Sequence, residues 1–230
     1  MQNPITDTHL GIDSNSDKFS QVRQRAKFER REDLNKSIKL LQSILEESIQ
    51  YNPQQRFSEL HPFLNKVISN NCKIVLEIGA ADGGLSFIFS KLFTRVVALD
   101  KYHTATYDTN NIIRLTLDSH NPGPLFKRII ELGPYDLILI DGDHSYEGVK
   151  KDFEIYSPLL ALGGIVAFHD IKDTELQRQN NCFVSKFVTE VQAANLHIST
   201  KVFNEFSDEW SGRFNPAFKN GGGIQMFKFQ

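Results

Sequence analysis

From residue 73 onward, hydrophobic residues fall into short continuous runs separated by longer, more polar segments. Strands that are apolar along their whole length are typical of a parallel sheet covered by helices on both faces. The runs predict strands over residues 74–78, 95–99, 112–116, 135–140 and 164–168. The segments between them predict helices over residues 84–92, 146–161 and 178–194. Two later runs predict a closing antiparallel pair over residues 198–203 and 224–229.

The first 70 residues follow a different pattern. Residues 1 to about 28 are polar and lack periodicity, which indicates a loose arm. Apolar residues at spacings of three and four then mark one face of a helix, namely Leu34, Ile38, Leu41, Leu45 and Ile49. A second helix contains Leu64, Val67 and Ile68. We expect these helices to cap the sheet and to line either a ligand pocket or a contact between copies of the chain. The second alternative would make the protein a homo-oligomer.

Together these patterns predict an α/β fold built as one domain. Its core is a doubly wound, Rossmann-like, mostly parallel sheet of seven strands, with a C-terminal antiparallel strand pair and an N-terminal helical cap. We divide the chain into an arm and helical cap over residues 1–70, which belong to the same domain, and a sheet region over residues 71–230.

The first predicted strand runs into a glycine-rich turn, Gly79-Ala80-Ala81-Asp82-Gly83-Gly84. Such turns usually bind phosphate through backbone N–H groups and a helix N-terminus. Glu77 and Asp82 oppose a phosphate here, and they suit a cofactor with positive charge and hydroxyl or ammonium donors, such as S-adenosylmethionine. Ala81 also occupies the middle glycine position of the dinucleotide fingerprint. A tight turn without a ligand is the alternative.

A second acid, Asp100, ends the next predicted strand, 23 positions after Glu77. This spacing accommodates a strand, a turn, a helix and a second strand, so we expect Asp100 at the tip of the neighbouring strand. Its carboxylate could accept hydrogen bonds from both hydroxyls of a ribose. An ordinary solvated acid at the end of a strand is the alternative.

Acids and histidines end the fourth and fifth predicted strands, as Asp141-Gly142-Asp143-His144 and His169-Asp170. Ligands of open parallel sheets bind at the carboxyl edge, where these segments and the glycine turn meet. The acids and imidazoles therefore converge on the expected position of the reactive end of the cofactor. Asp-Gly is also a common turn dipeptide, and a single histidine is more often structural than catalytic.

Composition narrows the class of protein and its partners. The chain has 230 residues, 40% hydrophobic content and a formal net charge of −2, which suits one globular domain and no polyanion-binding surface. Acids interrupt the basic cluster at residues 23–31, so we expect no nucleic-acid partner. Neither a membrane-spanning run nor a signal peptide is evident, which predicts no membrane partner and a cytoplasmic location. Cys72 and Cys182 lack metal-type spacing, and we expect reduced thiols.

Over about residues 72–171, these features resemble the class I S-adenosylmethionine-dependent methyltransferases, and most of all the small-molecule O-methyltransferases. Residues 75–86 are similar to the first motif of the family, and residues 140–146 with 163–170 look like its fourth- and fifth-strand signature. The resemblance implies cofactor contacts from Glu77, Gly79, Ala80, Asp82, Gly83, Ser86, Asp100, Asp118, Ser119 and Asp141.

Cation-dependent members of this family hold a divalent ion with an acid after the fourth strand and an Asp-Asn pair after the fifth. They carry a base, usually lysine, three residues after the first acid. The resemblance places Asp141 at the first acid and His144 at the base. The pair His169-Asp170 departs from Asp-Asn, and only Asp170 matches the two acids of some sugar methyltransferases. The implied metal ligands are Asp141, Asp170 and His169, where oxygen ligands favour Mg²⁺ and a direct histidine ligand would admit Mn²⁺.

The expected reaction is therefore O-methylation of a hydroxylated small molecule, such as a sugar or a secondary metabolite. A metal on Asp141 and Asp170 would position the acceptor oxygen, and His144 would take its proton, with His169 as the competing base. Each histidine could instead only orient a carboxylate. A nicotinamide-dependent oxidoreductase and a module that binds the cofactor without transferring its methyl group are the other functions considered. We expect residues 30–70 and the loop at 205–220 to form the acceptor pocket.

Overall fold

The computed structural model describes residues 36–194, 196–203 and 222–229, and it divides the chain into two units, Met1–Ser43 and Ile44–Gln230. Described residues 36–43 of the first unit are helical. In the second unit, residues 44–48 are helical and are followed by η1 (Ile49–Tyr51) and α2 (Phe57–Ser69). The two N-terminal helices are thus confirmed where they are described, and α2 belongs to the same unit as the sheet. The predicted arm, Leu34 and the loop at 205–220 lie outside the described residues.

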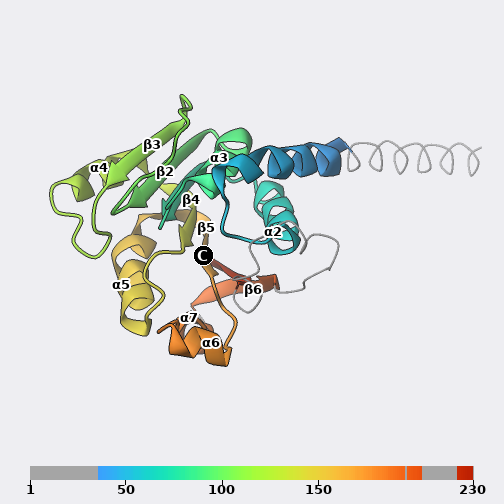
Figure 1. Cartoon of the computed structure of the whole chain (residues 1–230). Coiled ribbons are helices and arrows are strands. Elements are labelled where there is room, and N and C mark those ends of the chain that lie inside the picture. The colour runs from blue at the N-terminus through green and yellow to red at the C-terminus, as the bar shows by residue number, and fades with distance from the viewer. Residues whose placement is uncertain (1–35, 195, 204–221, 230) are drawn as a thin grey trace, which may run out of the picture. The chain divides into compact units, whose positions relative to one another are not determined.

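Seven strands form one sheet in the order β3-β2-β1-β4-β5-β7-β6, with β7 antiparallel to both of its neighbours (Figure 1). The strands are β1 (Ile74–Ile78), β2 (Arg95–Asp100), β3 (Ile112–Thr116), β4 (Tyr135–Ile140), β5 (Leu160–His169), β6 (His197–Phe203) and β7 (Ile224–Phe229). The predicted sheet and its antiparallel pair are confirmed. Because the strand order reverses beside β1, a ligand crevice is expected at the carboxyl ends of β1 and β4.

Helices cover both faces of this sheet (Figure 1). They are α3 (Gly84–Leu92), α4 (Leu125–Leu132), α5 (Tyr146–Tyr156), α6 (Glu175–Gln179) and α7 (Val184–Ala194). One apolar core joins α4, α5 and α7 to side chains from one face of the sheet, such as Leu76, Ile138 and Phe168. The alternate residues Val75 and Leu137 are also fully buried, because successive side chains of a strand point to opposite faces. Burial on both faces explains the continuous apolar runs.

Two predicted helices have different bounds in the structure. The helix expected over residues 146–161 ends at Tyr156, and the short helix η2 (Ser157–Leu159) leads into β5, which begins at Leu160. Pro158 lies within η2 and lacks the N–H group that a continuing α-helix requires. The helix expected over residues 178–194 is two helices, α6 and α7. Between them Asn181 has a left-handed backbone with φ of 58°, which an α-helix does not accommodate.

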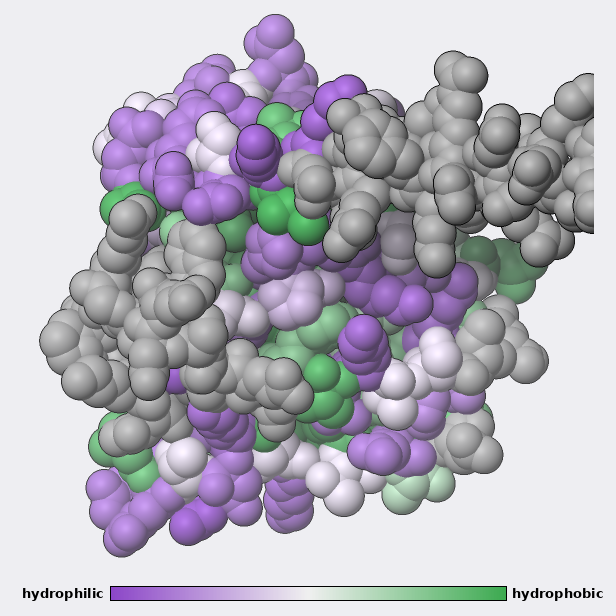
Figure 2. All heavy atoms as spheres, turned by 90° about the vertical axis from the view of Figure 1, so that its right-hand side faces the viewer, coloured by the Kyte–Doolittle hydropathy of each residue, from purple (hydrophilic) through white to green (hydrophobic). Residues whose placement is uncertain are grey.

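On the face shown in Figure 2, hydrophilic residues dominate the described part of the surface, and hydrophobic residues appear in small separate groups. Among the described helices, none has the length and apolar character needed to cross a membrane. Cys72 and Cys182 are buried and free, which agrees with the expectation that they form no disulfide.

Candidate active site

The glycine turn is shaped by its closeness to the end of β4. Gly79 has φ of +89°, and a Cβ atom there would lie 2.1 Å from the backbone oxygen of Asp141. The N–H groups of Gly79 and Ala80 donate to the carbonyl of Leu99 at 2.9 and 3.1 Å, which fixes the turn to β2. Gly83 also has a left-handed backbone, with φ of +82°. Only glycine fits position 79, so this residue of the turn is required by backbone geometry.

The carboxylate of Asp100 faces the turn from the tip of β2, as the spacing predicted. It accepts hydrogen bonds from the backbone N–H groups of Ala81 and Tyr102, each at 2.8 Å. Asp82 accepts hydrogen bonds from Thr104 and from Asn52, the latter at 2.7 Å. These two hydrogen bonds lower the pKa of Asp82 below its ordinary value. Both carboxylates are therefore held in fixed positions at the wall of the cavity.

Glu77 lies beneath the turn with only 1% of its surface exposed, and its carboxylate accepts a hydrogen bond from Ser86. Burial raises the pKa of Glu77 to about 8, partly offset by that hydrogen bond and reinforced by the charges of Asp141 and Asp100. Glu77 lines the cavity, whereas Ser86 is buried behind it. The structure thus places Ser86 as the support of Glu77.

Residues 118–120 lie near the amino end of α5, where His120 contacts the carbonyl of Gly148. Ser119 and His120 line the cavity, and Asp118 lies outside the described lining. Asp118 accepts from the backbone N–H of His120 at 3.0 Å and pairs with Lys101 at 3.4 Å. Behind His120 lies the fully buried Asp152, 3.5 Å from its Nε2 atom. Burial raises the pKa of Asp152 to about 6.

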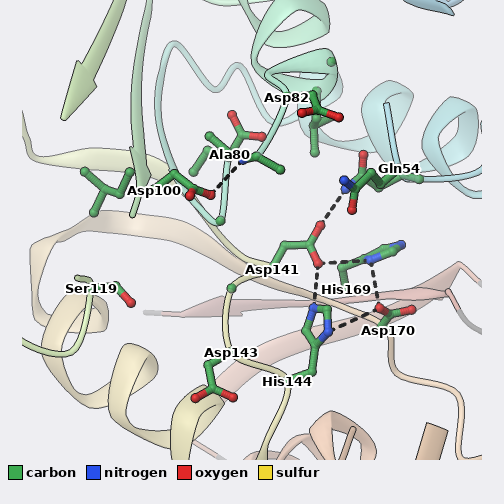
Figure 3. Close-up of a pocket in the computed structure, with 18 of the residues that line it drawn as sticks. Gln54, Ala80, Asp82, Asp100, Ser119, Asp141, Asp143, His144, His169 and Asp170 are labelled. Carbon is green, nitrogen blue, oxygen red and sulfur yellow. Dashed lines mark hydrogen bonds and ion pairs between the residues drawn. The ribbon is translucent and has the colours of Figure 1, made fainter. Parts of the chain in front are cut away.

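At the other end of the cavity, two histidines and a second carboxylate surround Asp141 (Figure 3). The Oδ1 atom of Asp141 lies 3.1 Å from Nε2 of His144 and 3.2 Å from Nδ1 of His169. Its Oδ2 atom accepts a hydrogen bond of 2.5 Å from the side-chain amide of Gln55. Burial alone would raise the pKa of Asp141, but the charges and hydrogen bonds of His169 and His144 lower it. Asp141 is therefore ionised although it is buried.

Asp170 completes this cluster, with Oδ2 3.7 Å from Nδ1 of His144 and 3.8 Å from Nδ1 of His169. It follows β5 with a left-handed backbone, φ of 58°, and its Oδ1 atom accepts from the N–H of Gly222 at 2.6 Å. The side chain of His144 is 35% exposed, and that of His169 is 6% exposed. Only His144 is thus well placed to meet an acceptor molecule directly.

Both histidines have raised pKa values. Burial by itself lowers the pKa of both imidazoles. For His144, the hydrogen bond to Asp141 and the charges of Asp141 and Asp170 outweigh burial and raise the pKa. For His169, the charges of Asp141 and Glu59 outweigh burial and raise the pKa well above its ordinary value. The carboxylates thus favour a positive charge at this end of the cavity.

One cavity of about 430 Å³ connects the two ends. Its described lining contains most of the cofactor-contact residues expected from the sequence, together with His144, His169 and Asp170. Among the described residues, Asp141, His144 and Asp170 have ligand atoms that lie within 4.8 Å of one another and could share a metal ion. The Nδ1 atom of His169 also lies 3.2 Å from Asp141 and 3.8 Å from Asp170. The metal set expected from the sequence differs in one member, because it contains His169 in place of His144.

The sequence analysis did not identify two buried residues of the site. Gln55 lies just before α2, and Glu59 lies in the first turn of that helix. Gln55 is 5% exposed and Glu59 is fully buried, and both line the cavity. Glu59 stands four residues before Phe63 and beside Leu60, on the stripe of α2 that is otherwise apolar. An acid at a core-facing helix position was a signal for Glu59, since buried charges are rare without a partner. Gln55 had no comparable signal.

Comparison with known proteins identifies the class of this domain. Residues 76–171 match the family described as "Methyltransferase domain". The chain is 28% identical over 133 residues to protein R132 of Acanthamoeba polyphaga mimivirus, covering 51% of this chain and 60% of that protein. It is 27% identical over 106 residues to demethylmacrocin O-methyltransferase of Streptomyces fradiae, covering 42% and 27% respectively. The matched regions thus span less than two thirds of both relatives.

Solved structures share the fold at low sequence identity. An O-methyltransferase of Bacillus cereus in complex with SAH has a TM-score of 0.53 and 19% identity, covering 82% of this chain and 91% of that one. The MycE methyltransferase of the mycinamycin pathway, in complex with Mg and SAH, has a TM-score of 0.50 and 17% identity, covering 74% and 49%. Residues 76–171 therefore match a methyltransferase domain, and the chain shares its fold with methyltransferases solved in complex with SAH, which favours this class over a nicotinamide-dependent oxidoreductase.

Proposed function

We propose that the protein transfers a methyl group from S-adenosylmethionine to a hydroxyl oxygen of a small molecule, such as a sugar or a secondary metabolite, with help from a divalent cation. One observation carries this proposal. A single cavity has the glycine turn and Asp100 at one end and the cluster of Asp141, His144, His169 and Asp170 at the other. A binding module that performs no transfer has no need of such an acid–base cluster.

Two of the similar proteins support the choice of acceptor and of cation. The Streptomyces relative is named as an O-methyltransferase of demethylmacrocin. The MycE structure is described with Mg and SAH together. Both likenesses cover only part of the proteins compared, so the acceptor and the cation are proposals for this chain.

The cofactor end fits S-adenosylmethionine by its charge and its backbone. The acceptor oxygens of Asp82 and Asp100 suit ammonium and ribose hydroxyl donors, whereas a phosphate would bring further acceptor oxygens to them. The left-handed Gly79 lets the turn pass close to the backbone of Asp141, where a side chain would clash. Bound S-adenosylmethionine supplies the electrophilic methyl group.

The reaction end fits a divalent cation by its donor set. Asp141 and Asp170 offer carboxylate oxygens close to two imidazoles, and the raised histidine pKa values indicate an excess of negative charge. Asp141 and Asp170 would hold the ion, with His169 as the third donor. A bound divalent ion supplies Lewis acidity that lowers the pKa of an acceptor hydroxyl and fixes its position.

His144 is the proposed general base. Its partly exposed ring is held by Asp141 on one nitrogen and lies near Asp170 on the other. An aliphatic hydroxyl is a poor nucleophile, so methyl transfer requires that its proton be removed as the oxygen attacks. Neutral His144 would take that proton, and His169 is the competing candidate.

The proposed partner is a hydroxylated small molecule, in the cytoplasm, with no nucleic acid or membrane involved. Part of the cavity wall comes from the N-terminal cap, which supports a contribution of the cap to acceptor binding; these residues are Asn52, Gln54, Gln55, Arg56 and Glu59. A homo-oligomer is compatible with this proposal but is not required by it.

A binding measurement followed by a substrate screen tests the proposal. SAH should raise the melting temperature and bind with 1:1 stoichiometry, whereas NAD should do neither. A panel of sugars, macrolides and phenols is then incubated with S-adenosylmethionine, and SAH formation is measured with and without divalent ions. SAH binding combined with N- or C-methylation, or with no turnover on any hydroxylated acceptor, would count against the proposed reaction.

A further inference from the structure

Glu59 is a fully buried carboxylate, and both of its oxygens contact other parts of the chain. Its Oε1 atom accepts from the backbone N–H of Arg56 at 2.9 Å and lies 2.8 Å from Nε2 of His169. Its Oε2 atom accepts from the backbone N–H of Gly223 at 2.6 Å. Backbone N–H groups only donate, so both oxygens of Glu59 act as acceptors, and we assign the hydrogen of the Glu59–His169 contact to Nε2 of His169.

This contact decides which nitrogen of His169 faces the reaction centre. With Nε2 bound to Glu59, Nδ1 is the atom that lies 3.2 Å from Asp141 and 3.8 Å from Asp170. Histidines that bind metals usually donate their other ring N–H to a carboxylate or carbonyl, which fixes the ring and its tautomer. Glu59 and His169 have this arrangement relative to the two proposed cation ligands.

His144 differs from His169 in this respect. It directs Nε2 to Asp141 and Nδ1 to Asp170, so both of its nitrogens face the carboxylate pair. Its side chain is also more exposed, at 35% compared with 6%. The contact with Glu59 therefore distinguishes a fixed, buried imidazole from one that can meet an acceptor molecule.

We propose that Glu59 is a positioning residue that holds His169 as a nitrogen ligand of the cation, so that the site prefers Mn²⁺ or another transition ion to Mg²⁺. The inference rests on the cation assistance proposed above. Imidazole suits transition ions, whereas Mg²⁺ prefers oxygen ligands in a strict octahedral arrangement. Glu59 belongs to α2, so the N-terminal cap takes part in setting the metal preference of the sheet edge.

The test uses the full chain with Mn²⁺ or Mg²⁺ alone as the probe. Calorimetry gives the affinity for each ion, and electron spin echo envelope modulation detects nitrogen nuclei coupled to bound Mn²⁺. We expect tighter binding of Mn²⁺ than of Mg²⁺ and a nitrogen signal that persists in His144→Ala and disappears in His169→Ala. Glu59→Ala should weaken Mn²⁺ binding by about 10- to 100-fold, the usual effect of removing such a partner.

Phe63→Leu is the matched control, because Phe63 lies on the same helix, packs against Phe203 and carries no polar group that could hold an imidazole. It should lower stability while leaving Mn²⁺ affinity and the nitrogen signal unchanged. Glu59→Gln, of nearly equal volume, replaces Glu59→Ala if the alanine variant does not fold, and the expected loss of affinity is the same in direction.

Three results would overturn the inference: a nitrogen signal that persists in His169→Ala, wild-type Mn²⁺ affinity in folded Glu59 variants, or equal affinity for Mn²⁺ and Mg²⁺. Binding of either ion without a nitrogen signal would overturn it while leaving cation-assisted methyl transfer intact. A wild-type chain that binds neither ion would overturn both this inference and the proposed role of a cation.

Discussion

The two ends of the cavity are built in different ways. At the cofactor end, Asp100 is held by backbone N–H groups of the turn and of its own strand end, and Glu77 by the hydroxyl of Ser86, nine residues later. At the reaction end, Asp141 is held by Gln55, 86 residues away, and by His169, 28 residues away. The first end depends on neutral donors, most of them close in the sequence, whereas the second end also depends on charged groups from distant segments.

This difference has a consequence for how substitutions act. Loss of one neutral donor at the cofactor end leaves the other hydrogen bonds in place. Loss of one charged group at the reaction end leaves its partner buried without a compensating charge, which lowers the stability of the folded site. We therefore expect larger functional effects at the reaction end than at the cofactor end.

The largest expected effect is that of removing divalent ions. Chelation should abolish turnover, because Asp141 and Asp170 could then no longer orient an ion and the acceptor oxygen, while SAH affinity measured by calorimetry should change little. Such a result would sharpen the separation between the two ends. Full activity in excess chelator, with no metal found by elemental analysis, would show that the carboxylates act only on the histidines or the acceptor.

The second prediction concerns His144. His144→Ala should lower kcat by about 10²- to 10⁴-fold, the usual contribution of a general base, with SAH affinity retained. Since Asp141 raises the pKa of His144 against the effect of burial, wild-type turnover should fall as the pH is lowered through this raised pKa and the base becomes protonated. Steady-state kinetics over a pH series with an acceptor found by screening provide the measurement.

His103→Ala is the control for that variant, because His103 contacts the carbonyl of Leu115 at 3.2 Å and is not among the described residues of the cavity wall. It should retain normal kcat. Near-normal kcat in His144→Ala beside an inactive His169→Ala would reverse the assignment of the base.

The third prediction uses the buried acid of the cofactor end. Burial raises the pKa of Glu77 from its ordinary value of 4.5 to about 8, so the folded state holds this proton more tightly than the unfolded state. Its contribution to stability is complete below pH 4.5 and is lost as the pH rises toward 8. The loss is at most about 5 kcal/mol, since one pKa unit corresponds to about 1.4 kcal/mol.

Urea unfolding of the cofactor-free chain at several pH values measures this effect. Glu77→Gln keeps the size of the side chain and removes the ionisable group, so stability should decline less between pH 5 and pH 8 in the variant than in the wild type. Identical pH profiles for the two proteins would show that Glu77 does not bind the extra proton.

The smallest expected effect is that of Asp100→Ala on cofactor affinity. Removal of a charged hydrogen-bond acceptor should weaken SAH binding by about 1.5–3 kcal/mol, or about 10- to 150-fold in Kd. Asp108→Ala is the control, because the side chain of Asp108 is 95% exposed. Calorimetry of both folded variants decides the matter, and an unchanged Kd in Asp100→Ala would remove Asp100 from the ribose site.

Much of the fold followed from local patterns. Continuous apolar runs predicted the positions of β1 to β4, β6 and β7 to within about one residue, because strands buried on both faces must be apolar throughout. The helix α4 (Leu125–Leu132) was not predicted, and the other errors lay where helices end. Pro158 and Asn181 act through backbone geometry, which hydrophobic periodicity does not report.

For the candidate site, the sequence by itself determined which residues end the strands. Four of these residues lie at the carboxyl edge of the sheet, namely Gly79, Asp100, Asp141 and His169. Their positions were predictable because the extent of an apolar strand and the residues of the turn that follows it can be read from the local sequence. The tertiary structure alone decided their partners. Glu59 meets His169 across 110 residues, and Gly222 meets Asp170 across 52, because only the folded backbone brings α2 and the start of β7 to the ends of β4 and β5.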